Sequence, residues 1–134
     1  MISKKVIPFI ENYRDLIEEE NFEALYNAVE RTYIKSADLT EAFLEASVNP
    51  MVYFHDTIPK AYAEGLPLTT INIPDGILSV GISAFSKCPE LTSVHLPESL
   101  TSIESSAFFQ CSKLININLP ENISYIGPGA FQSC

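Results

Sequence analysis

The stretch LTTINIPDGILSVGISAFSKCPE at residues 68–90 decides the fold, because the chain carries two further copies of it. The second copy is LTSVHLPESLTSIESSAFFQCSK at residues 91–113, and the third is LININLPENISYIGPGAFQSC at residues 114–134, which stops two residues short. A fixed period of this length is typical of a solenoid, in which each repeat forms one structural unit. Such a chain buries its core between neighbouring copies.

Six positions keep an apolar residue of similar type in every copy. They are Leu68, Leu91 and Leu114; Ile71, Val94 and Ile117; Ile73, Leu96 and Leu119; Ile77, Leu100 and Ile123; Val80, Ile103 and Ile126; and Phe85, Phe108 and Phe131. The alternation at the start of each copy predicts a short strand with alternate residues facing inward, and a proline then ends that strand. The later Ala-Phe pair predicts a tight helical turn on the opposite side. Stacked copies would pair their strands as a parallel sheet.

The segment before the first copy is interpreted as a degenerate half-repeat, placed one repeat period ahead of it. Ala61 and Tyr62 then fall on Ala84 and Phe85, and Gly65 falls on Cys88. Terminal repeats are atypical because they cap the stack. The sequence therefore predicts a solenoid over residues 55–134, with the half-repeat at 55–67, and a helical cap over residues 1–54 that seals its first face.

The first part of the cap has apolar residues at a helical spacing. One stripe is Phe9, Ile10, Tyr13, Leu16 and Ile17, and a second, on a new register, is Phe22, Leu25, Tyr26, Val29 and Tyr33. These stripes predict one helix over about residues 8–19 and another that starts after Asn21 as its cap. One long bent helix is the alternative.

A third helix is indicated further along the cap. Its apolar positions are Leu39, Ala42, Phe43 and Ala46. Asp38 and Glu41 stand at the spacing of a capping box. Residues 51–54 are apolar without a clear period and fit either a helical turn or a short strand. The predicted fold class is α+β, a helical cap followed by a short repeat solenoid.

The composition bounds the function. The formal net charge of −9 and an apolar fraction of 46% describe an acidic folded protein. Because nucleic acid is bound by clustered Lys and Arg, and only Lys4 and Lys5 are adjacent, we expect no nucleic-acid partner. The sequence shows no export signal and no apolar run that could span a membrane. The expected location is cytoplasmic, or the cell surface if an export signal was removed.

The repeat also carries a family resemblance. The pattern L-x-x-(I/V)-x-(I/L)-P-x-x-(I/L)-x-x-I-x-x-x-A-F-x-x-C, which recurs at the interval from Leu68 to Leu91, resembles the BspA-like class of leucine-rich repeats. The resemblance covers about half of the chain, over residues 57–134. It implies a curved right-handed solenoid with its strands on the concave side. It also implies a role in protein contact or, in exported members, adhesion to cells or matrix. Residues 1–54 lie outside the resemblance.

The outward positions of the predicted strands form three rows that are candidate partner-binding residues. The rows are Thr70, Ser93 and Asn116; Asn72, His95 and Asn118; and Asp75, Glu98 and Glu121, just past each proline. The acidic row fits a cation site or a stripe that selects a basic partner, but such a row is more often merely solvated. Likewise, His95 is more often a surface histidine than a contact residue.

The remaining reactive side chains indicate no catalytic site. Cys88, Cys111 and Cys134 share one repeat position, which predicts a ladder of small buried side chains rather than a disulfide framework or a zinc site. Neither His55 nor His95 has ligands at metal-site spacing, and no nucleophile elbow, phosphate loop or HExxH motif is present. We therefore expect no catalysis, no metal and no cofactor.

The last copy ends without a polar cap, so its apolar edge should need a cover. That cover would be a second copy of the protein, which would make it a homo-oligomer, or further coils of a longer array. The predicted function is a noncatalytic protein-interaction module with an unidentified protein partner and no membrane contact. The alternative is a fragment of a bacterial cell-surface adhesion protein.

Overall fold

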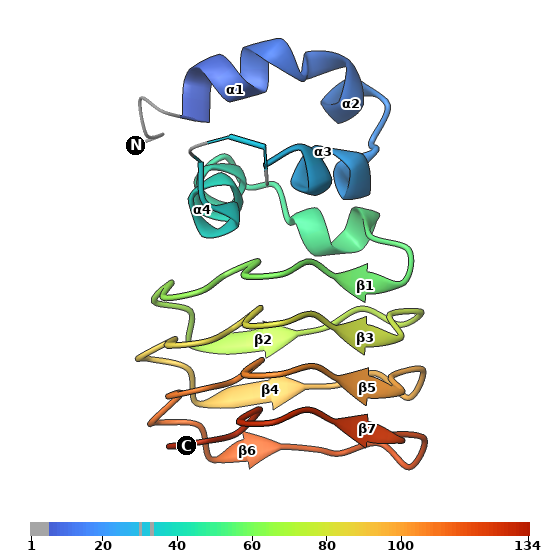
Figure 1. The fold of residues 1–134 in the computed structure, drawn as a ribbon, viewed down its shortest axis with the longest axis vertical. Helices are drawn as coiled ribbons and strands as arrows, with labels where there is room; N and C mark the ends of the chain where they lie inside the picture. Colours follow the sequence, from blue (N-terminus) through green and yellow to red (C-terminus); the bar gives the residue numbers. More distant parts are fainter. Residues whose placement is uncertain (1–5, 30, 33) are drawn as a thin grey trace.

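A computed structural model describes residues 6–29, 31–32 and 34–134 (Figure 1). The helices are α1 (Val6–Asn12), α2 (Arg14–Glu18), α3 (Phe22–Val29), α4 (Ser36–Glu45) and the 3₁₀ helix η1 (Pro50–Tyr53). The strands are β1 (Thr57–Ile58), β2 (Thr70–Asn72), β3 (Ser79–Val80), β4 (Ser93–His95), β5 (Ser102–Ile103), β6 (Asn116–Ile117) and β7 (Tyr125–Ile126). The helices cover one end of a stack of flat coils, and the predicted α+β solenoid is confirmed.

Two parallel sheets run along the stack. Sheet A has the order β1-β3-β5-β7, and sheet B has the order β2-β4-β6. Each full coil gives one strand to each sheet (Figure 1). The sequence predicted the strands of sheet B but not those of sheet A, because a two-residue strand such as β3 is too short to show an alternating pattern.

The half-repeat is one residue shorter than a full coil. Thr57 of β1 pairs with Ser79 of β3, and Ser79 pairs with Ser102 of β5. The stretch from Thr57 to Ser79 is therefore one residue shorter than the stretch from Ser79 to Ser102. The left-handed backbone at Ala61 recurs at Ser83, and that at Gly65 recurs at Lys87. The predicted matches of Ala61, Tyr62 and Gly65 with Ala84, Phe85 and Cys88 are therefore each wrong by one residue. The missing residue lies in the segment that leads into sheet B. The half-repeat has one residue fewer between Gly65 and Leu68 than the first full coil has between Lys87 and Leu91.

Despite that shift, a column of aromatic rings passes through the coils. Tyr62 packs edge-on against Phe85 with 5.9 Å between ring centroids, Phe85 stacks on Phe108 at 5.5 Å, and Phe108 stacks on Phe131 at 5.4 Å. In the half-repeat the bulky residue precedes the small one, as Tyr62-Ala63, whereas a full coil has Ala84-Phe85. The exchanged order lets the Tyr62 ring continue the column, and it also hides the one-residue deletion from the sequence pattern.

The column continues into the helices. The centroid of the Tyr62 ring lies 5.6 Å from that of Tyr26 in α3 and 5.5 Å from that of Phe54, which follows η1. The Tyr26 hydroxyl is hydrogen-bonded to the Thr40 hydroxyl of α4 at 2.5 Å, and burial raises the pKa of Tyr26 well above its usual value. Helices and coils thus share one continuous hydrophobic core.

The first two predicted helices are separate, and the first is itself broken. Tyr13 separates α1 from α2. Glu20, which precedes α3, adopts a left-handed backbone conformation with a φ of 58°. The Asn21 side chain accepts a hydrogen bond from the Ala24 amide at 3.3 Å, which confirms the predicted cap. Tyr33, which the apolar pattern assigns to this helix, lies outside the described residues.

The predicted capping box of the next helix is wrong. Because α4 begins at Ser36, Asp38 and Glu41 lie inside the helix, and Lys35 occupies the cap position without a side-chain bond. Residues 51–54 form the helical alternative: η1 starts at Pro50, and its cap Asn49 accepts a hydrogen bond from the Met51 amide.

Helix α3 bonds to the backbone at the start of sheet A. In the coils, the amides of Leu78 and Ser79 donate to the Asp56 carbonyl of the preceding coil. At the start of the half-repeat, the Glu23 carboxylate of α3 accepts from the amides of His55 at 2.8 Å and Asp56 at 3.4 Å, and Asp56 is the equivalent of Leu78 in the strand register. The equivalent of the donor Gly81 is Pro59, which has no N–H to satisfy. Both features reduce the number of free backbone donors at this edge, which makes pairing with another chain less favourable.

Glu23→Gln is expected to lower the free energy of unfolding by about 1 kcal/mol, because a neutral amide oxygen accepts the two backbone bonds less strongly than a carboxylate. Urea denaturation measures the change. Glu19→Gln, on an exposed residue of the same segment, is the matched control. Equal midpoints for both variants would show that Glu23 does not hold the helices on the coils.

Candidate interaction surface

Sheet B presents the predicted rows on one face. Thr70 pairs with Ser93, Ser93 pairs with Asn116, and Asn72 pairs with His95 in the parallel register. In β2 the burial alternates, with Ile71 buried between two exposed residues. The first two rows are therefore assembled across the strands as the sequence predicted, with Asn118 just beyond the end of β6. Their role in binding stays a prediction.

Asn118 is engaged with the protein's own backbone. Its side-chain oxygen accepts from the Leu96 amide at 3.1 Å, and its side-chain nitrogen donates to the Leu96 carbonyl at 3.1 Å. These two bonds continue the ladder where β6 has ended, so Asn118 fixes the last coil onto the one before it. The sequence pattern could not distinguish this side chain from its free-facing neighbours in the row.

The acidic row lies in the turns after the strands. Asp75, Glu98 and Glu121 are all exposed. The turns are tied together by neutral groups: the Ser99 hydroxyl accepts from the Gly76 amide at 3.0 Å and donates to the Ile77 carbonyl at 2.8 Å. Within residues 6–29, 31–32 and 34–134, no group of three or more His, Cys, Asp and Glu side chains is arranged to hold a metal ion.

A shallow hollow of about 390 Å³ lies on the sheet B face between the last two coils. Ser93, His95, Asn116 and Asn118 line it together with Ile115, whose side chain is 78% exposed. An apolar side chain beside polar groups is the usual make-up of a protein-binding surface. The sequence reasoning missed Ile115, and its only signal was an isoleucine where the other copies carry Thr69 and Thr92.

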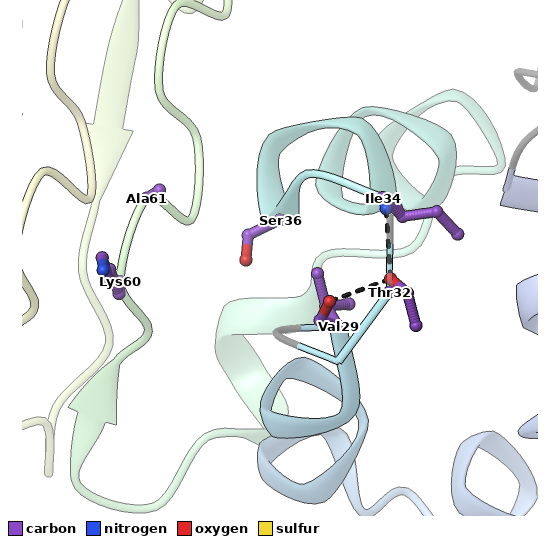
Figure 2. Close-up of a pocket in the computed structure, with 6 residues that line it drawn as sticks. All are labelled: Val29, Thr32, Ile34, Ser36, Lys60 and Ala61. Atoms are coloured by element: carbon purple, nitrogen blue, oxygen red, sulfur yellow. Dashed lines mark hydrogen bonds between the residues drawn. The ribbon is translucent and has the colours of Figure 1, made fainter.

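A second hollow, of about 410 Å³, lies between the helices and the half-repeat. Figure 2 shows Lys60 and Ala61 across from Ser36, while the Thr32 hydroxyl donates to the Val29 carbonyl at 2.8 Å and accepts from the Ile34 amide at 3.1 Å. The lining residues comprise one amine, two hydroxyls and apolar groups. They do not form a nucleophile with a base.

The cysteines form a ladder, and the prediction that its side chains are buried is confirmed for Cys88 and Cys111 but is wrong for Cys134, which is exposed in the last coil. The Cys88 sulfur donates to the Ala63 carbonyl at 3.3 Å, and Cys111 and Cys134 bond in the same way to Phe85 at 3.1 Å and Phe108 at 3.0 Å. Each thiol thus links its coil to the preceding one. The neighbouring Cys111 and burial together raise the pKa of the Cys88 thiol.

Because Cys88 and Cys111 are buried and Cys134 is exposed, we expect only the last thiol to react rapidly with a disulfide reagent in the native protein at neutral pH. In denaturant all three should react. Cys134→Ser should remove the fast phase and leave the two slow ones. Rapid labelling of all three native thiols would contradict the ladder.

The match to a protein-family model decides the identity of the repeats. The model of the BspA type leucine rich repeat region matches residues 56–134. The chain belongs to the BspA-type leucine-rich repeat family. This confirms the predicted resemblance over almost the same residues, the half-repeat included.

A solved structure agrees with this family. The BspA-type chain is 34% identical to a leucine-rich repeat protein from Bacteroides ovatus ATCC 8483, with a TM-score of 0.57. The match covers 58% of this chain and 21% of that one, so it spans about a fifth of the length of the Bacteroides protein. No curated protein matches the sequence. Among the described residues, no helix is both long and apolar enough to cross a membrane.

Proposed function

We propose that this BspA-type repeat protein is a noncatalytic module that binds a partner protein through the face of sheet B. The observation that carries the proposal is the alignment of side chains from β2, β4 and β6 on one face, with a hollow lined by His95 and Ile115 between the last two coils. Family membership supports a role in protein interaction or adhesion.

The framework under this face favours binding without rearrangement. Val94 beneath it is 2% exposed and Phe108 in the adjoining column is fully buried, so the strands rest on a packed core. A surface held in this way loses little conformational entropy when a partner binds. The net charge of −9 favours a partner with a basic surface, chiefly by steering its approach.

The second candidate is an adhesion fragment at the bacterial cell surface. BspA-type repeats are usually found in cell-surface bacterial proteins, and this supports the candidate. The two candidate functions use the same face of sheet B and differ in the partner, which is a protein of the same cell in the first and a host or matrix protein in the second.

Quantitative affinity capture tests the proposal. The bait is the full chain, and the comparison is the triple variant Ser93→Ala, His95→Ala and Glu98→Ala. The control variant carries Glu64→Ala and Ser112→Ala, two exposed positions outside sheet B. A partner recovered by the parent and the control but lost from the triple variant supports the proposal. Equal recovery of the partner by the parent, the triple variant and the control variant would contradict the proposal.

We also propose that the last coil contacts a second copy of the chain. Leu119, Tyr125 and Ile126 are 54%, 47% and 46% exposed, whereas the equivalents Leu96 and Ile103 are buried. This coil carries one charged side chain, Glu121, so electrostatic repulsion there is weak despite the net charge. Sedimentation velocity should show reversible association that Ile126→Lys abolishes. A parent that stays monomeric at high concentration would overturn this contact.

A further inference from the structure

The two sheets begin at different levels of the stack. The half-repeat supplies β1 to sheet A, but sheet B starts with β2 in the first full coil. Figure 1 shows β4 on one side of β2 and, on the other, the loop of the half-repeat and then the helices, with no strand paired to β2 there. The edge of β2 is therefore the place where a strand of the half-repeat would lie if that repeat were complete.

The hydrogen bonds show which backbone groups of β2 face this edge. The Thr69 carbonyl accepts from the amides of Thr92 and Ser93, and the Ile73 amide donates to the His95 carbonyl, so both residues face β4. Because backbone groups alternate in direction along a strand, those of Thr70 and Asn72 point to the opposite edge. They present the donors and acceptors that a further strand would use.

An apolar hollow of about 220 Å³ adjoins the same edge. We call it the β2 groove, and its lining is Leu44, Asn49, Met51, Tyr62, Leu68, Thr70, Ile71, Asn72 and Phe85. Leu68 is only half-buried here, although its equivalent Leu91 is fully buried under the preceding coil. The groove is thus the space that the missing strand and its inward side chain would fill.

The helix beside the groove is acidic. Helix α4, which contributes Leu44, has the sequence SADLTEAFLE, with three acids and no base, and Glu41 on it is exposed. A ligand with Lys or Arg beside its apolar residues complements this helix and the net charge of −9.

We propose that the β2 groove binds an extended peptide of a partner protein, which adds to sheet B beside β2. Its backbone bonds to Thr70 and Asn72, an apolar side chain enters the groove between Leu44 and Leu68, and basic residues flank that segment. This is strand addition, in which the backbone supplies affinity and the pocket supplies selectivity. The groove shares Thr70 and Asn72 with the face of sheet B, but it does not include Ser93, His95 or Ile115, so either proposal can fail without the other.

The probe is a labelled peptide with the sequence of residues 91–96, LTSVHL, and two lysines at each end, because this strand already pairs with β2 on the other side. Fluorescence anisotropy measures its binding to the full chain. A scrambled peptide of the same composition is the first control. Two further peptides carry N-methyl groups on alternate residues, one on each edge of the strand. Methylation of the edge that faces β2 should weaken binding at least about tenfold.

Protein variants test the groove from the other side. Leu44→Lys places a charge at the groove and should weaken the binding of the peptide at least about tenfold. Thr70→Pro removes a backbone N–H donor at the edge of β2 and should weaken the binding of the peptide to a similar extent. Ile82→Lys, at a side chain of 47% exposure outside sheet B, is the matched control and should bind as the parent does. Circular dichroism verifies that each variant is folded.

Three results would overturn the proposal. The first is a parent peptide that binds no better than the scrambled one. The second is full binding by both N-methylated peptides, because backbone pairing would then not be involved. The third is Leu44→Lys abolishing self-association while the peptide fails to bind, which would make the groove a contact between two copies of this chain.

Discussion

Phe108→Ala is expected to lower the free energy of unfolding by about 3–5 kcal/mol, the usual cost of removing a fully buried phenylalanine. Phe108 has no exposed surface and stacks between Phe85 at 5.5 Å and Phe131 at 5.4 Å. Its removal leaves a cavity in the middle of the column, with rigid coils on both sides. The surroundings can relax only a little to fill it.

Urea denaturation followed by circular dichroism measures this loss. Phe109→Ala is the matched control, because the neighbouring ring is only half-buried and lies outside the column. We expect Phe109→Ala to cost clearly less than Phe108→Ala. Equal midpoints for the two variants would contradict the stacked column as the core of the coils.

Tyr62→Ala is expected to cost a similar amount, about 3–5 kcal/mol. The Tyr62 side chain is 1% exposed and packs against rings on both sides of the junction, with Tyr26 and Phe54 toward the helices and Phe85 toward the coils. The variant should therefore also separate the unfolding of the helices from that of the coils.

Two probes detect that separation. Hydrogen exchange of the α3 amides reports the helices, and exchange of the Val94 amide in β4 reports the coils. In the parent we expect both to exchange by the same global opening, whereas in Tyr62→Ala the helices should open at lower free energy. Tyr125→Ala, at a ring that is 47% exposed, is the control. An unchanged exchange pattern in Tyr62→Ala would show that this ring does not join the two parts.

The coils were predictable because each structural requirement recurs. The inward residues of sheet B, the proline after each strand, the aromatic column and the cysteine ladder all fall at one period in the sequence. A side chain that fills the same space in every coil must have a similar size and shape, so the same or a similar residue recurs in every copy. The family match over residues 56–134 agrees with that pattern.

The junction was less predictable because it depends on contacts between residues far apart in the chain. The carboxylate of Glu23 accepts hydrogen bonds from the backbone amides of His55 and Asp56 at the start of the half-repeat, and nothing in its neighbours along the sequence indicates this. The deletion before Leu68 was obscured by the exchanged order of Tyr62 and Ala63. The division of the chain after residue 54 stays a prediction.

The candidate site was predictable in its rows and not in its details. Alternation placed Thr70, Ser93 and His95 on one face, and the strand pairing brings them together. The same alternation could not show that Asn118 is bonded to the Leu96 backbone or that the edge of β2 lies beside an apolar groove. Both depend on where the ladder of sheet B begins and ends.

Site-specific photo-crosslinking tests whether the face of sheet B binds a partner protein. The photo-crosslinking residue p-benzoylphenylalanine replaces His95 in one sample and Ile82, which is exposed outside sheet B, in the other. We expect a discrete covalent adduct from position 95 that the Ser93→Ala and Glu98→Ala substitutions reduce, with little or none from position 82. An adduct from position 82 alone, or none from position 95, would contradict it.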